Sequence, residues 1–292
     1  METTIIYGAG SLGKTLFPKI KERFHGGKLF FADSNPNLWG TSILGTPIIS
    51  PEEIQQLEYS RIIITTIAGF ETIPARLTSI FKIPVEKIDL SFTQNIYDRT
   101  YLIRNRFLER FAEIVKIKKL KGNVVEGGVF EGNFAKKINA AFPTKSLYLF
   151  DTFEGFDERD IAVEKGDTHN RAKHFSAAIS QEMLLSIMPY PERVVIRKGY
   201  FPETAEGIDD AFVFVNLDFD LFQPTLAGLK FFYPKMVQGG VILVHDYFQD
   251  SVIPDKSLSF QGVREAVEKY SMENNVMYIP IGDDMSIVLL RN

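Results

Sequence analysis

Residues 123–134, which read NVVEGGVFEGNF, restrict the possible folds of this sequence more than any other stretch. A short apolar run ends there in an acid, Glu126, and a helical pattern begins at Phe134. Three glycines separate the acid from the helix: Gly127, Gly128 and Gly132. A strand that ends in a glycine-rich turn and continues into a helix is typical of the ligand-binding edge of an open α/β sheet. The spacing, E-x-G-x-x-x-G, differs from the dinucleotide pattern G-x-G-x-x-G.

The composition excludes several classes of function. A chain of 292 residues is long enough for two domains. Its net charge of −4 argues against a general nucleic-acid binder, because such proteins carry a basic excess. The absence of cysteine excludes disulfides, thiolate metal sites and cysteine nucleophiles. No apolar run approaches the roughly 20 residues that span a bilayer, so we expect no membrane insertion and a cytoplasmic location, while homo-oligomer formation stays open.

Residues 1–92 are predicted to form a small Rossmann-like α/β domain. Residues 4–7 and 28–32 are apolar enough for two buried strands, and a helical pattern lies between them. The turn after the first strand has a true G-x-G-x-x-G spacing, made by Gly8, Gly10 and Gly13. Asp33 follows the second strand, at the position where a Rossmann unit places an acid against a ribose.

Two interpretations of this first domain stay open. In one, the glycine turn and Asp33 form a nucleotide or nucleotide-sugar site at a helix N-terminus. In the other, the domain serves only for docking and binds no ligand, because fold does not decide function. The segment resembles the small Rossmann-like domains attached to sugar-modifying enzymes. Further along it, Pro51 is expected to begin a helix, and residues 61–66 are expected to form another buried strand.

Residues 93–121 are predicted to form a helical linker. Apolar residues recur at helical spacing between Ile96 and Val115. Basic residues, Arg104 and Arg106 among them, fill other positions and are candidates for a cap over an anionic ligand. A solvated face on a connecting helix is the preferred interpretation.

Residues 122–292 are predicted to form the main α/β domain. Strands and helices alternate as far as residue 271, and two final strands follow at 276–281 and 286–290. The short turn between those two strands demands an antiparallel hairpin. Parallel strands closed by such a hairpin match the seven-stranded sheet of the S-adenosylmethionine-dependent methyltransferases. The other strands are expected at 124–126, 146–150, 193–197, 211–217 and 241–244.

Acids and glycines follow these predicted strands. In a doubly wound sheet, ligands collect at the carboxyl ends of the strands. The residues at those ends are Glu126, Asp151, Gly199, Asp218, His245 and Asp246. Acids gathered at one edge predict a binding or catalytic site rather than a set of solvated loops. Asp151 is suited to accept hydrogen bonds from both ribose hydroxyls of a nucleoside.

Five ordered motifs, from residue 122 to the C-terminus, resemble the macrocin O-methyltransferase family. They are VVEGGVFEGNFAKKIN, SLYLFDTFEGF, KGYFPET, FVNLDFDLFQPT and GGVILVHDY. That family methylates sugar hydroxyls on natural products, using S-adenosylmethionine and usually a divalent metal. The resemblance implies that the cofactor is contacted by Glu126, Gly127, Gly128, Phe130, Gly132, Asp151, Thr152, Gly199, Tyr200, Phe201 and Asp218.

The resemblance also implies a metal site at Asp218, Asp220 and Asp246. Mg²⁺ prefers oxygen ligands and lowers the pKa of a bound hydroxyl, which suits the methylation of a poor nucleophile such as a sugar hydroxyl. Asp218 or His245 is the candidate base for the hydroxyl proton.

The sequence departs from the family at His245. Similar enzymes often carry two adjacent acids before the aromatic, whereas this chain has His245-Asp246-Tyr247. Histidine is a poorer Mg²⁺ ligand than aspartate, so the metal site is expected to be weaker, different or absent. His245 could instead be the base, or simply a hydrogen-bonding residue of a loop.

Two long segments are expected at the ligand edge. Residues 157–191 are long for a connection between strands and predict a lid, with an amphipathic helix at 175–188 over the cofactor. The loop 248–260 is the candidate for acceptor recognition.

The sequence therefore predicts a two-domain O-methyltransferase that acts on a sugar hydroxyl of a glycan or a natural-product glycoside. The first domain would hold or present a nucleotide-linked or glycosidic acceptor. Two alternatives stay open: a nucleotide-sugar oxidoreductase that uses NAD in the first domain, and a non-catalytic scaffold with two pockets.

Overall fold

The structure is a computed structural model that describes residues 2–67, 69–164, 169, 172, 179–253 and 260–292. The chain divides into two compact units, Met1–Tyr101 and Leu102–Asn292. Residues 93–121, predicted as a linker, contain elements of both units. The short helix α3 (Gln94–Tyr97) belongs to the first unit, and the long helix α4 (Ile103–Lys118) belongs to the second.

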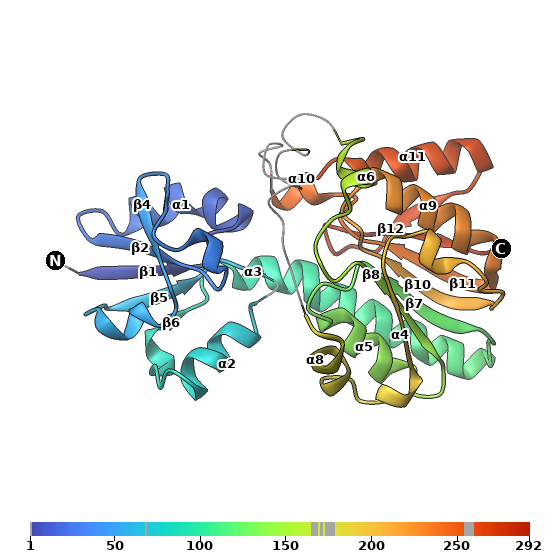
Figure 1. The fold of residues 1–292 in the computed structure, drawn as a ribbon, viewed down its shortest axis with the longest axis horizontal. Helices are drawn as coiled ribbons and strands as arrows, with labels where there is room; N and C mark the ends of the chain where they lie inside the picture. The colour runs from blue at the N-terminus through green and yellow to red at the C-terminus, as the bar shows by residue number, and fades with distance from the viewer. Residues whose placement is uncertain (1, 68, 165–168, 170–171, 173–178, 254–259) are drawn as a thin grey trace. The chain divides into compact units, whose positions relative to one another are not determined.

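The first unit is built on a six-stranded sheet in the order β3-β4-β2-β1-β5-β6 (Figure 1). All neighbouring strands are parallel except β3 and β4, which form an antiparallel pair. The strands are β1 (Thr3–Tyr7), β2 (Lys28–Ala32), β3 (Ser42–Ile43), β4 (Thr46–Ile49), β5 (Arg61–Ile64) and β6 (Ile88–Asp89). Besides α3, its described α-helices are α1 (Ser11–Arg23) and α2 (Thr72–Ser79). The helix expected from Pro51 is only a short 3₁₀ helix, Glu53–Gln56.

Both faces of this first sheet are buried, which explains its continuous apolar strands. Successive side chains of a strand point to opposite faces. Ile62 and Ile64 pack in a cluster with Leu77 of α2, whereas Ile63 packs in a second cluster with Ile20 of α1. A strand buried on both faces therefore needs successive apolar residues, as at 62–64 of β5.

The second unit is built on a seven-stranded sheet in the order β12-β13-β11-β10-β7-β8-β9. The strands from β7 to β11 run parallel, and β13 pairs antiparallel with both β11 and β12. The predicted parallel sheet with a closing antiparallel hairpin is confirmed. The strands are β7 (Asn123–Gly127), β8 (Leu147–Asp151), β9 (Val194–Lys198), β10 (Phe212–Leu217), β11 (Met236–Val244), β12 (Tyr278–Pro280) and β13 (Ile287–Leu290).

Helices cover both faces of the second sheet (Figure 1). Val124 packs in a cluster with residues of α4 and α5, and its neighbour Val125 packs in a cluster with residues of α9 and α11. The described helices of this unit besides α4 are α5 (Asn133–Ala141), α6 (Glu158–Ile161), α8 (Gln181–Ser186), α9 (Phe222–Phe232), α10 (Gln249–Val252) and α11 (Gly262–Asn274). Burial of both faces leaves the carboxyl edge of the strands as the place where polar side chains gather.

The segments predicted as lid and acceptor loop are described only in part. The helix expected at 175–188 corresponds to the shorter α8, and residues 175–178 lie outside the described residues. The loop expected at 248–260 contains α10, and residues 254–259 lie outside the described residues. Among the helices described, none combines the length and apolar character needed to cross a bilayer.

Candidate active site

The carboxyl edge of the second sheet brings together the acids that follow its central strands. Strand β10 lies between β7 and β11. Asp218 is held at the end of β10 by its backbone N–H, which donates to the Gly127 carbonyl at 2.7 Å. His245 is held beside it, because its backbone N–H donates to the Leu217 carbonyl at 2.9 Å. The turn after β7 and the turns after β10 and β11 are therefore adjacent.

Close packing within the protein requires glycine in the turn that follows β7. A Cβ at Gly128 would lie 2.1 Å from the Asp218 carbonyl oxygen, and the φ of Gly128 is +80°. A Cβ at Gly132 would lie 2.3 Å from Cδ1 of Leu184 in α8, and the φ of Gly132 is +78°. A Cβ at Gly127 would meet the ring of Phe219. A side chain at Gly128 would force the turn away from the Asp218 backbone, whereas side chains at Gly127 and Gly132 would displace the side chains of Phe219 and Leu184.

Asp151 ties the end of β8 to the same turn. Its Oδ2 accepts hydrogen bonds from the backbone N–H groups of Val129 at 2.6 Å and Phe130 at 3.1 Å. Its Oδ1 accepts from the N–H of Phe153 at 2.7 Å. A carboxylate has about four lone-pair positions, so Asp151 keeps the capacity to accept from a ligand hydroxyl. The role predicted for Asp151 stays a prediction, and the geometry is compatible with it.

The other residues predicted to contact the cofactor differ in their surroundings. Phe130 is 40% exposed, whereas the ring of Phe201 is buried among Phe150, Phe219 and Phe232. The hydroxyl of Thr152 donates to the Gly155 carbonyl. The N–H of Gly199 donates to the Asp151 carbonyl at 3.0 Å. Phe201 therefore belongs to the core that supports the edge, and Phe130 faces outward from it.

Tyr200 contacts a buried acid, Asp160 of α6. The Tyr200 hydroxyl donates to Oδ1 of Asp160 at 3.3 Å, and the guanidinium of Arg159 lies 3.5 Å from the centre of the Tyr200 ring. Asp160 is 6% exposed. Burial raises the pKa of Asp160 to about 7, although the Tyr200 hydrogen bond opposes the rise.

We expect Asp160→Asn to gain stability relative to the wild type as the pH rises. The unfolded pKa of an aspartate is about 3.9, so the raised folded pKa makes wild-type stability fall from about pH 4 to about pH 7. Asparagine does not titrate, and the difference should reach the order of 1 kcal/mol. Urea unfolding at about pH 5 and about pH 8 measures it. Glu158→Gln, on the exposed side of α6, is the control; equal pH behaviour of the two variants would contradict the assignment.

A buried arginine that was expected on a solvated face lies in this site. Arg104 of α4 is 2% exposed. Its Nη2 donates to Oδ1 of Asn216 at 3.0 Å and to Oδ2 of Asp218 at 2.9 Å. Its guanidinium also lies 3.8 Å from the centre of the Phe134 ring. The preferred interpretation of Arg104 was therefore wrong, and this residue supplies a positive charge beside Asp218.

Arg104 connects Asp218 to the acid at the end of β7. Asn216 and Glu126 are register partners on β10 and β7, and Nδ2 of Asn216 donates to Oε1 of Glu126 at 3.1 Å. Glu126 is 1% exposed, and burial raises its pKa well above the usual range although Arg104 opposes the rise. Its Oε2 is buried without a hydrogen-bond partner in the described part of the chain. A ligand N–H at this edge would donate to Oε2, so the surroundings of Glu126 fit the amine of S-adenosylmethionine.

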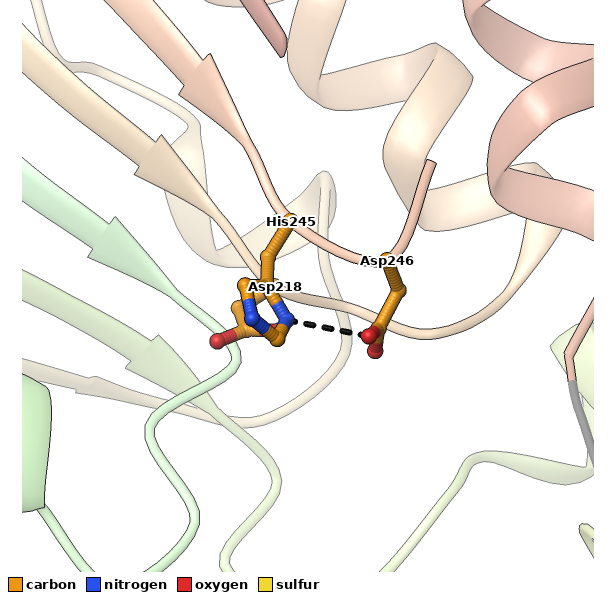
Figure 2. Close-up of side chains that lie close together, drawn as sticks. All are labelled: Asp218, His245 and Asp246. Atoms are coloured by element: carbon orange, nitrogen blue, oxygen red, sulfur yellow. Dashed lines mark ion pairs between the residues drawn. The ribbon is translucent and has the colours of Figure 1, made fainter. Parts of the chain in front are cut away.

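Asp218, His245 and Asp246 form a compact cluster at the ends of β10 and β11 (Figure 2). Nδ1 of His245 lies 3.1 Å from Oδ1 of Asp218 and 3.1 Å from Oδ1 of Asp246. Burial and Arg104 lower the pKa of His245, but the two carboxylates outweigh them and raise it to about 10. Burial disfavours the charged carboxylates, yet His245 keeps the pKa values of Asp218 and Asp246 below their usual range.

Asp220 contacts this cluster through Asp246. Its side chain hydrogen-bonds Asp246, and burial followed by the charge of Asp246 raises its pKa well above the usual range. Both residues have left-handed backbone, with φ of 63° at Asp220 and 62° at Asp246. Such conformations cost about 1–3 kcal/mol and concentrate at functional sites. The converging donor atoms come from Asp218, His245 and Asp246, and a ligand role for Asp220 stays a prediction.

The donor set of the cluster fits a divalent cation. One atom from each of the three side chains lies within 4.8 Å of the others, as required of ligands to one ion. Two carboxylate oxygens and one imidazole nitrogen are common metal ligands in proteins.

In the first unit, the structure brings together Gly8, Gly13 and Asp33. A Cβ at Gly13 would lie 2.0 Å from the Gly8 carbonyl oxygen, and the φ of Gly8 is +117°. Asp33 accepts from the N–H of Ala9 at 2.8 Å and from the N–H of Asn35 at 2.8 Å. Gly10, the third glycine of the pattern, borders open space. The nucleotide site predicted at Gly8, Gly10, Gly13 and Asp33 stays a prediction.

Comparison with solved structures shows the fold of the second unit in methyltransferases. The O-methyltransferase NovP is 23% identical with a TM-score of 0.52, over 65% of this chain and 80% of that structure. The calicheamicin methyltransferase CalS11 is 18% identical with a TM-score of 0.53, over 76% of this chain and 91% of that structure. At these identities the similarity establishes the fold.

Sequence comparison gives a relative and two family matches. The 8-demethyl-8-(2,3-dimethoxy-alpha-L-rhamnosyl)-tetracenomycin-C 4'-O-methyltransferase of Streptomyces olivaceus is 22% identical over 156 residues. This chain aligns through 49% of its own length and spans 60% of that curated relative. Residues 1–88 match the family described as C2185-like, N-terminal. Residues 100–288 match the macrocin-O-methyltransferase (TylF) family, and the chain belongs to that family.

Proposed function

We propose that this protein is an S-adenosylmethionine-dependent O-methyltransferase that acts on a sugar hydroxyl of a glycan or a natural-product glycoside. The observation that supports it most is the continuous polar edge from Asp151 and Glu126 to Asp218, His245 and Asp246. The end with Asp151 and Glu126 suits a nucleoside and an amine. The end with Asp218, His245 and Asp246 suits an acceptor hydroxyl and its proton. The family match and the sugar O-methyltransferase relative support the same reaction.

Residues around the glycine turn would bind and orient the methyl donor. S-adenosylmethionine, when bound, supplies a methyl group carried by a positively charged sulfur. Asp151 would accept from a ribose hydroxyl while it holds the turn through the N–H groups of Val129 and Phe130. Glu126 would accept from the amine through its buried second oxygen.

Asp218 is the base that we assign. When a hydroxyl of the acceptor takes up the methyl group, its proton would pass to Asp218. The side chain of Asp218 is 22% exposed, whereas that of His245 is 10% exposed and directs Nδ1 toward two carboxylates. Arg104 holds Oδ2 of Asp218 at 2.9 Å and favours its ionised form. A divalent cation bound by Asp218 and Asp246 would lower the pKa of the hydroxyl.

The first unit would bind the nucleotide-linked or glycosidic part of the acceptor. Its glycine turn ends β1 at the N-terminus of α1, and Asp33 braces that turn through the N–H of Ala9. An acid at this position suits a ribose hydroxyl.

Calorimetric binding of S-adenosylmethionine by two matched variants tests the cofactor assignment. We expect Asp151→Asn to weaken binding by about tenfold to a hundredfold, since hydrogen bonds to a charged carboxylate are lost. Asp33→Asn removes the equivalent acid of the first unit and should leave the affinity unchanged. A wild-type protein that fails to bind S-adenosylmethionine at millimolar concentration would refute the proposal. Tight binding of NAD that Asp33→Asn abolishes would favour the oxidoreductase alternative instead.

A further inference from the structure

His245 places a nitrogen where a cation site built from acids would place an oxygen. The residue is 8% exposed, and Nδ1 lies 3.1 Å from an oxygen of each neighbouring carboxylate. These two contacts are ion pairs, and Nδ1 makes no strictly aligned hydrogen bond within the described part of the chain. The nitrogen is therefore buried and lies between two carboxylates, at the same distance from an oxygen of each.

Each of the two carboxylates makes a second contact, which orients one of its oxygens toward Nδ1 of His245. Arg104 holds Oδ2 of Asp218 at 2.9 Å, and Oδ1 of the same carboxylate is the atom near His245. The side chain of Asp220 hydrogen-bonds Asp246, whose Oδ1 is the atom near His245. Contacts of this kind orient metal ligands and improve affinity.

The backbone fixes the position of the imidazole as well. The N–H of His245 continues the sheet by donating to Leu217 at 2.9 Å, and the next residue, Asp246, has a φ of 62°. The Asp246 carbonyl accepts from the N–H of Gln249 at 3.3 Å, at the start of α10. His245 and Asp246 therefore extend from a rigid strand end rather than from a free loop.

We infer that Nδ1 of His245 is a metal ligand together with Oδ1 of Asp218 and Oδ1 of Asp246, and that this nitrogen makes the site prefer Mn²⁺, Co²⁺ or Zn²⁺ to Mg²⁺. Mg²⁺ is a hard ion that takes oxygen ligands, whereas imidazole suits first-row transition ions. The inference rests on the cation-assisted form of the proposed function and names the ion class.

Calorimetric titration of the chelator-treated full chain with Mg²⁺ and with Mn²⁺, one at a time, tests the inference. Any site with nitrogen or oxygen ligands binds some ions more tightly than others. The decisive quantity is therefore the change in the ratio of Mn²⁺ affinity to Mg²⁺ affinity when His245 is substituted. We expect His245→Asp, which gives an all-oxygen set, to lower that ratio by about tenfold or more. His25→Asp makes the same chemical change at an exposed turn of the first unit and should leave the ratio at the wild-type value. An unchanged ratio in His245→Asp overturns the inference.

A spectroscopic measurement on the wild-type protein does not depend on the folding of any variant. Electron spin-echo modulation of bound Mn²⁺ should show coupling to a nitrogen nucleus from His245. Absence of nitrogen coupling, or absence of Mn²⁺ binding, overturns the inference. Binding of S-adenosylmethionine is measured in the same samples. A protein that does not bind S-adenosylmethionine contradicts the proposed function. A metal site with oxygen ligands only, or no metal site, contradicts the inference but does not contradict methyl transfer.

Discussion

Asp218→Asn is expected to slow methyl transfer by about two to four orders of magnitude while S-adenosylmethionine binds with nearly wild-type affinity. Asparagine keeps the size of the side chain and an acceptor oxygen for Arg104, but it cannot take up the hydroxyl proton. The residues assigned to the cofactor, Asp151 and Glu126, do not hydrogen-bond Asp218 directly. Single-turnover rates at saturating cofactor, together with calorimetry, separate the two effects.

Asp209→Asn is the matched control for this variant. Asp209 is fully exposed and lies 3.5 Å from Lys235, so its amide variant should keep both rate and affinity. If Asp218→Asn loses cofactor binding and Asp151→Asn loses only turnover, the two roles have been assigned the wrong way round. A rate for Asp218→Asn within a few-fold of wild type would remove Asp218 as the base.

Arg104→Met should destabilise the protein by about 3 kcal/mol. Methionine fills much of the space of the arginine stem, but it leaves Asp218 and Asn216 without the guanidinium that holds them. Removal of one partner from a buried ion pair costs about 3–5 kcal/mol. The side chain of Asp218 keeps 22% exposure and a second neighbour in His245, so we expect the lower end of that range. The free energy of urea unfolding measures the loss.

Two further variants show whether the loss comes from the ion pair. Arg106→Met, on the exposed side of the same helix, should change the free energy of unfolding by less than about 0.5 kcal/mol. In the double variant Arg104→Met with Asp218→Asn, no uncompensated carboxylate remains. We expect the double variant to be more stable than additivity predicts, as a double-mutant cycle reports. Additive losses would mean that Arg104 stabilises the protein through its other contacts, with Asn216 and Phe134, and not through Asp218.

Much of the second unit could be predicted from its sequence because local patterns determine it. Adjacent apolar residues such as Val124 and Val125 point to opposite faces of the sheet, so both faces must be buried. The short turn at Gly282 allows the last two strands to pair only in the antiparallel direction. The acids at the edge could also be predicted, since parallel strands expose their carboxyl ends together. Glu126, Asp218, His245 and Asp246 accordingly lie at adjacent strand ends.

Long-range contacts limited the prediction elsewhere. At position 132 the close approach of Leu184 adds to the need for glycine, and no local pattern reveals it because Leu184 is distant in sequence. Arg104 does have a local signal. It lies in helical phase with Leu108, Phe111 and Val115, the buried stripe of α4. Asn216 has one too, as a polar residue within the otherwise apolar run of a central strand.

The position of Arg104 in the chain has a practical consequence. The sequence places the start of the methyltransferase domain near residue 122, and a shortened chain that begins there would retain the whole seven-stranded sheet. Such a chain would lack α4, and with it the cation that holds Asp218 and the helix that covers Val124. The smallest fragment that preserves the electrostatics of the site must therefore begin before Ile103. A fragment that begins at the first motif, near residue 122, would lose function because it lacks Arg104, and not because it lacks the first unit.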